Sequence, residues 1–151
     1  MVAVVENKIT GQIITTKAKI VDEQGNEHEI LCVGPLFVLP DFQNKGIGSM
    51  LLKHSIQEAK GLGFSGMILL GNPDYYHSFG FINAQEYGIS NKEDNNFESF
   101  MAIELQNNGL DTINGEFFED NAFDIKPDEL VEFEKNFSYK EKLVTDTQFE
   151  H

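Results

Sequence analysis

One stretch of the chain, residues 35–48, constrains the fold more than any other. It reads Pro-Leu-Phe-Val-Leu-Pro-Asp-Phe-Gln-Asn-Lys-Gly-Ile-Gly, a short apolar run of the buried type that Pro40 ends, followed by a loop with Gly46 and Gly48. An amphipathic helix pattern begins near Ile47. The first N–H groups of a helix have no partner within it and lie at the positive end of the helix dipole. The stretch therefore predicts a strand, a loop and a helix start that can bind a phosphate.

Other interpretations of these glycines must be weighed. The pattern Gln43-x-x-Gly46-x-Gly48 has no third glycine, so it differs from the six-residue dinucleotide-binding motif, and the Gly-Lys-Ser/Thr end of a P-loop is absent. A third interpretation is purely structural: the glycines let the helix pack closely on its strand. The motif alone leaves this interpretation open.

The stretch resembles motif A of the GNAT acyl-CoA N-acetyltransferases, in which Val-Leu-Pro-x-x-Gln-x-x-Gly-x-Gly precedes an amphipathic helix. A second match lies further on, because Tyr76, Gly80 and Phe81 have the spacing of the Tyr-x-x-x-Gly-Phe sequence that ends a short helix in that family. This second match argues against the purely structural interpretation. The resemblance covers residues 2–105. It implies a mixed α/β sheet of the GNAT-like acyl-CoA N-acyltransferase fold, shortened at its N-terminus and extended by an acidic C-terminal segment.

The resemblance also implies an activity, the transfer of an acetyl group from acetyl-CoA, as cosubstrate, to a small-molecule or peptide amine. It implies that Tyr76 is the acid for the departing thiolate, while Tyr75 is expected to pack the short helix. The residues implied in binding the cofactor are Phe37, Val38, Leu39, Gln43, Asn44, Lys45, Gly46, Ile47, Gly48 and Ser49. The first three are implied to turn backbone N–H groups toward the acetyl and pantetheine portions.

Two departures from the family pattern qualify this hypothesis. GNAT domains usually begin with a strand and two helices that wall part of the amine site, and this chain begins after them. The start is truncated, or another chain supplies the wall, or the protein is a catalytically weak or inactive acyl-CoA-binding regulatory or structural module. Many relatives also carry a glutamate as general base, but residues 31–36 hold no carboxylate, and Glu29 is the nearest upstream candidate.

Composition excludes several other classes of function. The net charge of −14 in 151 residues, without a local lysine cluster, argues against nucleic acid and anionic membrane as partners. The charge is compatible with a cationic substrate or with solubility alone. A single cysteine, Cys32, excludes an internal disulfide and is expected to be buried, and the four histidines do not converge, so no metal site is predicted. The chain has no apolar run near 18 residues and no signal-peptide pattern, which predicts a cytoplasmic protein.

The residues before the stretch at 35–48 predict an antiparallel meander. Residues 1–5 form a strand-like run that reaches a turn at 6–8, and residues 9–21 alternate with the period of a half-exposed strand. Turn-forming residues at 22–26 predict an antiparallel strand at about 27–33. Residues 1–5 would leave an open apolar edge, from which we predict a homodimer.

The stretch at 35–48 and the residues after it predict a unit of a strand, a helix and a second strand. Gly34 and Pro35 predict a bulge or a kink in the strand. The helix should end near 61–63, and the continuous apolar run at 64–70 is typical of a buried parallel strand. The residues expected on the buried face of the helix are Leu51, Leu52, Ser55, Ile56, Ala59 and Leu62. A very short helix should follow, between Pro73 and Gly80.

The last part of the chain is less regular. Residues 82–90 and 97–105 predict closing strands around an acidic loop at 91–96. We place the GNAT-like domain at residues 1–105 and an acidic extension at residues 106–151. The extension contains one predicted helix, at residues 127–136. The extension is expected to dock on the same domain through its aromatic residues, Phe117, Phe118, Phe123, Phe133 and Phe137.

Overall fold

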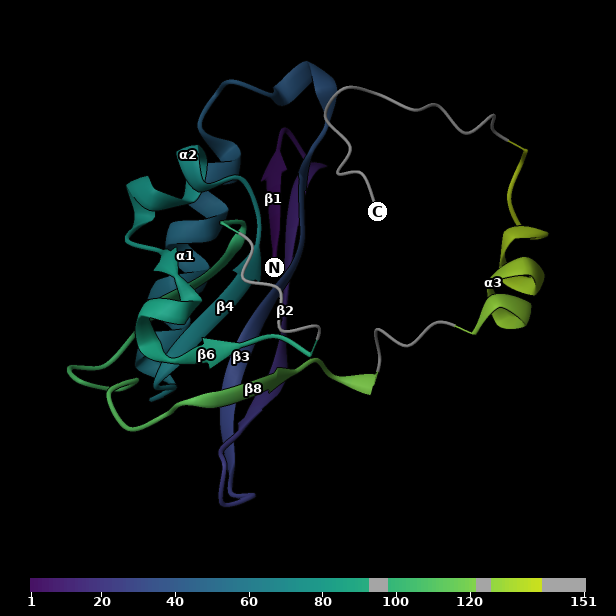
Figure 1. Cartoon of the computed structure of the whole chain (residues 1–151). Coiled ribbons are helices and arrows are strands. Elements are labelled where there is room, and N and C mark those ends of the chain that lie inside the picture. Colours follow the sequence, from purple (N-terminus) through teal and green to yellow (C-terminus); the bar gives the residue numbers. More distant parts are fainter. Residues whose placement is uncertain (93–97, 122–125, 140–151) are drawn as a thin grey trace. The chain divides into compact units, whose positions relative to one another are not determined.

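The chain divides into two units, Met1–Asp120 and Asn121–His151, in a computed structural model that describes residues 1–92, 98–121 and 126–139. The first unit carries a mixed sheet flanked by helices (Figure 1). Its described strands follow the order β5-β7-β4-β3-β2-β8-β6, and β1 pairs with β2. They are β1 (Val2–Val5), β2 (Lys8–Val21), β3 (Glu27–Val38), β4 (Gly66–Leu70), β5 (Ile82–Asn83), β6 (Ile89–Ser90), β7 (Phe100–Glu104) and β8 (Gly115–Phe118). This confirms the predicted mixed α/β class.

Two turns produce the predicted meander. Glu6 and Asn7 have φ angles of 50° and 61°, which suit the tight turn between the antiparallel strands β1 and β2. At the second turn the carboxylate of Asp22 accepts hydrogen bonds from the backbone N–H groups of Gln24 and Asn26, at 3.0 and 2.8 Å. β3 therefore returns antiparallel to β2, and it continues well beyond the predicted end near residue 33.

A bulge interrupts β3 where the sequence predicts one. Thr15 pairs with Val33 and Ile13 pairs with Leu36, so β3 has one residue more than β2 across this step. Beyond the bulge, residues 36–39 are half-buried or exposed, so the expectation of a buried run there is wrong. The physical reason is the loss of a neighbouring strand, because the described pairing of β3 with β4 ends at Cys32.

Helix α1 (Ile47–Gly61) starts at the predicted residue, with Gly46 as its N-cap at φ 81°. A left-handed backbone favours glycine at this position. The buried residues of the helix are Ile47, Leu51, Leu52, Ser55, Ile56 and Ala59. Leu62, which we expected on the same face, is 74% exposed. The helix ends at Gly61, and Gly63, at φ 84°, turns the chain away.

The sheet is buried on both faces, each by a separate hydrophobic cluster. Ile13 of β2 packs with α1 in one cluster, whereas Ala18 and Ile20 belong to the cluster on the other side. The predicted division of β2 into two alternating faces is therefore confirmed. The expectation that one of these faces is solvent-exposed is wrong, because each face is covered along a different part of the strand.

The elements after α1 follow the predicted order. β4 runs parallel to β3 and its first four residues are buried. The short helix α2 (Pro73–Tyr76) continues into a 3-10 turn, η2 (His77–Phe79), and Gly80 ends it with φ 94°. Proline at the start and glycine at the end are thus confirmed as the signals of this element.

The region after Phe81 differs from the prediction. Residues 82–90 are not one strand, because the 3-10 turn η3 (Ala84–Tyr87) separates the short strands β5 and β6. β8 was not expected at all. It pairs with residues 19–21 of β2, and Phe117 is buried 5.6 Å from the ring of Phe100. The first unit therefore extends to Asp120, past the boundary that we had placed at residue 105.

The second unit contains helix α3 (Pro127–Glu134), which matches the helix predicted at 127–136. None of its residues is buried, and the rings of Phe133 and Phe137 lie 5.0 Å apart. Phe123 and most of the loop at 91–96 lie outside the described residues. Docking of the C-terminal extension on the first unit stays a prediction.

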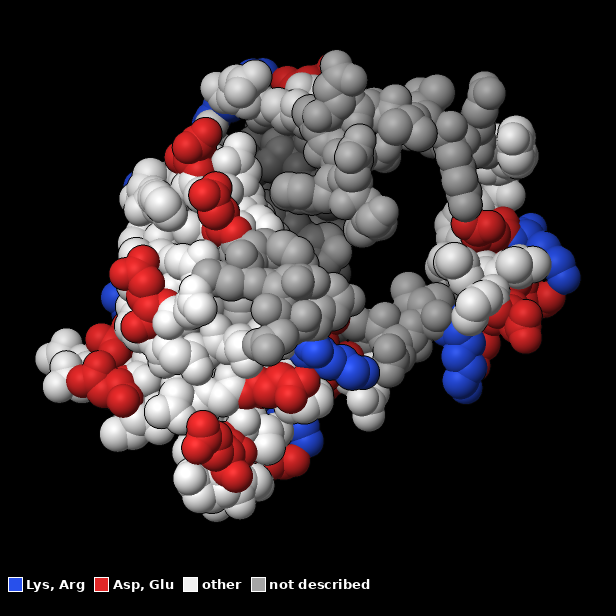
Figure 2. Space-filling model, viewed as in Figure 1, with Lys and Arg blue, Asp and Glu red and all other residues white. Residues whose placement is uncertain are grey.

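Acidic side chains predominate on the face shown in Figure 2, in keeping with the net charge of −14. Among the helices that the structure describes, none has both the length and the apolar character needed to cross a membrane.

Candidate functional site

The loop before α1 presents a row of unsatisfied backbone donors. Within the described residues, the N–H groups of residues 44–49 have no hydrogen-bond acceptor, whereas that of Met50 donates to Gly46 at 3.0 Å. Asn44 and Gly46 have φ angles of 57° and 81°, and alternation of right- and left-handed residues is the geometry of an anion-binding nest. Together with the positive end of α1, these groups can hold a phosphate.

Side chains fasten this loop to the end of β3. The Gln43 amide donates from Nε2 to the carbonyl of Val38 at 3.0 Å. The Lys45 ammonium donates to the carbonyl of Asp41 at 3.0 Å and lies 5.3 Å from the ring centroid of Phe42. Two residues that we expected in cofactor binding, Gln43 and Lys45, therefore shape the loop with their side chains. The backbone N–H group of Lys45 is left to contact a ligand, whereas that of Gln43 donates to the carbonyl of Pro40 at 3.2 Å.

The exposed end of β3 offers one further backbone donor. The N–H group of Leu39 donates to Thr10 on β2 at 2.8 Å. Alternate residues of an antiparallel pair point their backbone groups toward the partner strand. The backbone groups of Phe37 therefore also point toward β2, whereas those of Leu36 and Val38 point away from it. The bond from Gln43 to the Val38 carbonyl agrees with this orientation. Of residues 37–39, only Val38 thus directs its N–H group to the side that β4 has left.

Tyr76 lies shortly after the end of β4 and is half-buried against the cluster that includes α1. Its ring lies edge-on to Tyr75, at 5.0 Å between centroids, and to Phe81, at 6.0 Å. A methyl group at Gly71 would overlap the Tyr76 ring, so the glycine allows the ring to lie there. Burial, and to a lesser degree Tyr75, raises the pKa of Tyr76. The phenol therefore stays protonated at neutral pH and can donate a proton.

Tyr75 has a contact that the sequence did not reveal. Its hydroxyl lies 3.3 Å from Ser49 Oγ in the first turn of α1, and an added methyl group at Gly48 would lie 3.5 Å from the same hydroxyl. The Tyr75 side chain is 38% exposed, so Tyr76, not Tyr75, is the ring packed on the core. No local pattern pointed to this bridge between α1 and α2, because its two residues are 26 positions apart.

Glu29, the candidate base, lies far from these groups. It is eight residues before Phe37 on β3, which corresponds to about 26 Å at about 3.3 Å per residue. Its carboxylate pairs with the Lys17 ammonium at 2.9 Å. The structure therefore does not bring Glu29 to the site.

Cys32 and the histidines also lie outside the site. Cys32 is buried, as predicted, and burial raises the pKa of its thiol to about 12, so it is not a nucleophile at neutral pH. In the parts of the chain that the structure describes, no three His, Cys, Asp or Glu side chains are placed to bind a metal ion.

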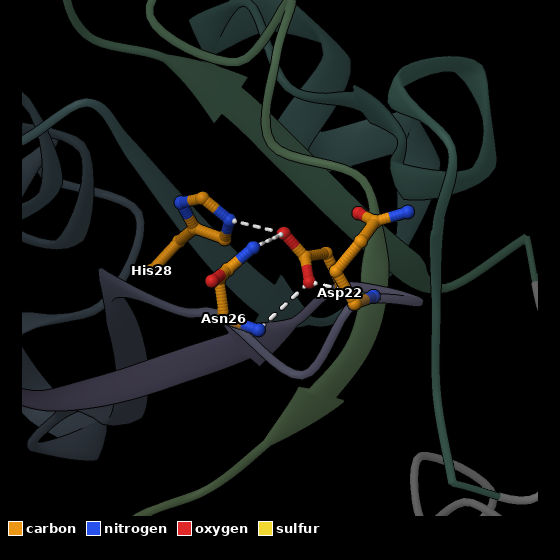
Figure 3. A network of polar contacts seen from close by, with 4 residues as sticks. Asp22, Asn26 and His28 are labelled. Carbon is orange, nitrogen blue, oxygen red and sulfur yellow. Dashed lines mark hydrogen bonds and ion pairs between the residues drawn. The ribbon is translucent and has the colours of Figure 1, made fainter.

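His28 takes part in a network at the turn between β2 and β3 (Figure 3). Asp22 accepts hydrogen bonds from Nδ2 of Asn26 at 2.9 Å and contacts Nε2 of His28 at 3.1 Å. The Asn26 side chain is the main cause that lowers the pKa of Asp22 from 3.8 to about 2, with smaller contributions from His28 and the backbone N–H groups. This network stabilises the turn.

The lowered pKa predicts how stability depends on pH. Because the folded-state pKa lies below the unfolded-state value, the Asp22 carboxylate stabilises the fold above pH 3.8, and this contribution is lost as the pH falls through about 2. We expect Asp22→Asn to flatten the decline of the unfolding free energy across this range, measured by chemical denaturation at a series of pH values. Glu23→Gln, in the same turn, is the control and should keep the wild-type slope. Equal slopes in all three proteins would contradict this assignment.

Comparison with known proteins places these features in context. Residues 1–83 match the family model described as Acetyltransferase (GNAT) domain. An uncharacterised N-acetyltransferase of Escherichia coli (strain K12), YjhQ, is 30% identical over 76 residues, which are 50% of this chain and 41% of that protein.

Two solved structures resemble the fold. The GNAT family N-acetyltransferase YhbS from Escherichia coli, in complex with CoA, has a TM-score of 0.71 at 19% identity and matches 80% of this chain and 65% of its own. A GNAT family acetyltransferase from Brucella melitensis, in complex with acetyl-CoA, has a TM-score of 0.62 at 27% identity and matches 81% of this chain and 66% of its own. This chain thus spans less than two thirds of the length of each of these relatives.

Proposed function

Because this chain belongs to the GNAT acetyltransferase family, we propose that it transfers an acetyl group from acetyl-CoA to the nitrogen of an amine. The observation that carries the proposal is the row of unpaired N–H groups at residues 44–49. This row lies next to the end of β3, which pairs with β2 but is no longer paired with β4, and to the protonated phenol of Tyr76. The relatives in complex with CoA and acetyl-CoA support this choice of cosubstrate.

The proposed reaction assigns one role to each set of donors. Acetyl-CoA supplies the acetyl group as a thioester, whose carbonyl carbon forms a bond to the amine nitrogen while its bond to sulfur breaks. The N–H groups of residues 44–49 hold the pyrophosphate, and that of Val38 donates to the thioester carbonyl oxygen as it gains negative charge. Tyr76 donates its phenolic proton to the departing thiolate. Since Glu29 is far from the site, we propose that the amine loses its proton to water.

A thiol-release assay tests this proposal. Acetyl-CoA and a panel of polyamines, amino-sugar antibiotics and peptides with free amino termini are incubated with the protein, and CoA release is followed. We expect turnover with at least one amine and a melting temperature that rises with acetyl-CoA, by an amount that corresponds to about 2.7 kcal/mol at 100 times the dissociation constant. Binding without turnover would identify an acyl-CoA-binding module instead, and absence of binding would contradict both functions.

We also propose that the protein forms a homodimer through the edge strand β1. Val2 and Val4 are 50% and 57% exposed, and Ile9 on the paired strand is 58% exposed. An exposed apolar edge strand favours association with another strand. Light scattering at micromolar concentration should give the mass of a dimer, and Val4→Lys should give a monomer. Leu62→Lys, at an exposed leucine after α1, is the control and should stay dimeric; a monomeric wild type would overturn the proposal. The cytoplasmic location stays a prediction.

A further inference from the structure

The face of the sheet opposite α1 is open beside the proposed reaction site. Farther along the sheet the second hydrophobic cluster covers this face, where Ala18 of β2 and Cys32 of β3 are both buried. Beyond them the cover ends, because Ile14 and Phe37 are 41% and 45% exposed. Two large apolar side chains that lie exposed next to a proposed site form the kind of surface that contacts a ligand.

Phe37 points to the face opposite α1. Its neighbours Leu36 and Val38 both pack on the cluster that includes α1, and successive side chains of a strand alternate between the two faces. Gln12 of β2 is the partner of Phe37, so its side chain lies on the same face as the ring. The Phe37 side chain thus lies next to the residue whose N–H group is proposed to bind the thioester carbonyl, on the side of the sheet away from α1.

Ile14 and Thr16 extend this surface along β2. The hydroxyl of Thr15, between them, lies 3.0 Å from that of Ser55 on α1, so Ile14 and Thr16 point to the opposite face. The hydroxyl oxygen of Thr16 is buried, and within the described residues it has no hydrogen-bond partner. The surface extends along β2 for four residues, about 13 Å. This open surface consists of Gln12, Ile14, Thr16 and Phe37.

An amine would reach the thioester from this side. The loop at 44–49 leads into α1, and Tyr76 packs on the cluster that includes α1. The proposed cosubstrate and its acid therefore occupy the α1 side of the sheet, at the point where β3 no longer pairs with β4. An amine that attacks the carbonyl carbon then approaches from the other face, where the open surface begins. Its carbon skeleton would lie along Phe37 and Ile14.

None of the side chains of the open surface carries a charge, although the chain has a net charge of −14. Burial, and to a lesser degree the charge of Glu119, raises the pKa of Cys32 on this face. Glu119 directly follows β8, at the level of Ala18, which is seven residues or about 23 Å along β2 from the partner of Val38. A short diamine bound at the site would therefore place its second ammonium group against uncharged, mainly apolar side chains, which costs free energy. An alkyl or aryl group in the same place would gain free energy by its burial.

We propose that the acceptor is a primary amine with an apolar body, and that Phe37 and Ile14 bind this body on the face of the sheet opposite α1. This inference rests on the proposed acetyl transfer and names the class of amine that takes part in it. The bonds formed and broken are those given above for the reaction. The protein thus selects against short polyamines, even though its overall charge would attract them.

Hexylamine and 1,5-diaminopentane test the inference, because they differ in one terminal group, a methyl in the first and an ammonium in the second. Thiol release with acetyl-CoA gives kcat/KM for each amine, and calorimetry with the CoA-saturated protein measures amine binding without turnover. We expect the wild type to prefer hexylamine about tenfold in both measurements. Phe37→Ser should lower this preference, because hexylamine loses its apolar contact and the diamine loses little.

A second variant introduces the missing charge. Ile14→Glu places a carboxylate on the open surface and should lower the preference for hexylamine to about one or less, because the second ammonium group of the diamine then has a partner. Leu62→Glu is the matched control, since it adds the same charge at an exposed leucine after α1, outside the open surface. It should keep the wild-type preference. Circular dichroism verifies the fold of each variant.

The outcomes separate this inference from the proposed function. A wild type that accepts both amines equally, prefers 1,5-diaminopentane or acetylates only other amines would overturn the inference and leave acetyl transfer intact. Folded Ile14→Glu and Phe37→Ser proteins that both keep the wild-type preference would overturn it too, as would its loss in Leu62→Glu, since the preference would then reflect overall charge. A wild type that binds acetyl-CoA and acetylates no amine would overturn the proposed function and this inference together.

Discussion

Replacement of Tyr76 by phenylalanine is expected to lower kcat by about 10²- to 10⁴-fold, the usual contribution of a positioned general acid. The affinity for acetyl-CoA and the melting temperature should stay close to those of the wild type. The ring makes the packing contacts, with Phe81, Tyr75 and the space above Gly71, and phenylalanine keeps that ring. Only the hydroxyl group is lost, and with it the proton for the departing thiolate.

Steady-state kinetics, calorimetry and thermal unfolding of the same preparations measure the three quantities. Tyr75→Phe is the matched control, since it removes a neighbouring hydroxyl that contacts Ser49 and leaves Tyr76 in place. Its kcat should change far less. Because burial raises the pKa of Tyr76, the loss of wild-type activity at alkaline pH that reports this phenol should begin above its ordinary pKa of about 10. Undiminished kcat in Tyr76→Phe would limit Tyr76 to packing and assign protonation of the thiolate to water.

The elements that the sequence predicted well are those specified by local chemistry. The start of α1 at Ile47 depends on the glycine loop directly before it, and the end of the short helix depends on Gly80, which has φ 94°. The bulge depends on Gly34 and Pro35, neither of which supports regular pairing. Each signal lies within a few residues of the structure that it produces, so a single sequence is enough to read it.

The features that escaped prediction depend on pairing between distant segments. β8 pairs with β2, which lies about a hundred residues earlier in the sequence, and nothing in the sequence of β8 indicates which strand it pairs with. The orientation of the Val38 N–H group follows from the register between β3 and β2, which the bulge sets. Gly71 shows its importance only when the ring of Tyr76 is seen above it. The residue types of the site could therefore be predicted from the sequence. Which backbone N–H groups are free to bind a ligand could not.

Replacement of Gly48 by valine is expected to weaken acetyl-CoA binding at least tenfold, about 1.4 kcal/mol, with the protein still folded. Gly48 is the second residue of α1, and a Cβ atom there would lie 3.5 Å from the Tyr75 hydroxyl and 3.7 Å from Val38 Cγ2, both ordinary contacts. The backbone therefore accepts a side chain. The two methyl groups of valine would extend beyond Cβ toward the unpaired N–H groups of the first turn, where they would exclude a phosphate.

The size of the expected loss of affinity follows from the hydrogen bonds between the backbone N–H groups and the phosphate. Each charge-assisted hydrogen bond contributes about 1.5–3 kcal/mol, and the valine would remove or lengthen at least one. Calorimetry with acetyl-CoA measures the loss, and circular dichroism verifies the fold. Gly61→Val provides the control: Gly61 is the last residue of the same helix, and a Cβ atom there would have no neighbour within 4 Å. That variant should bind acetyl-CoA as the wild type does. Equal affinities of the wild type and Gly48→Val would remove the phosphate from the start of α1 and leave the glycine with a packing role, in which it lets α1 lie close to Val38 and Tyr75.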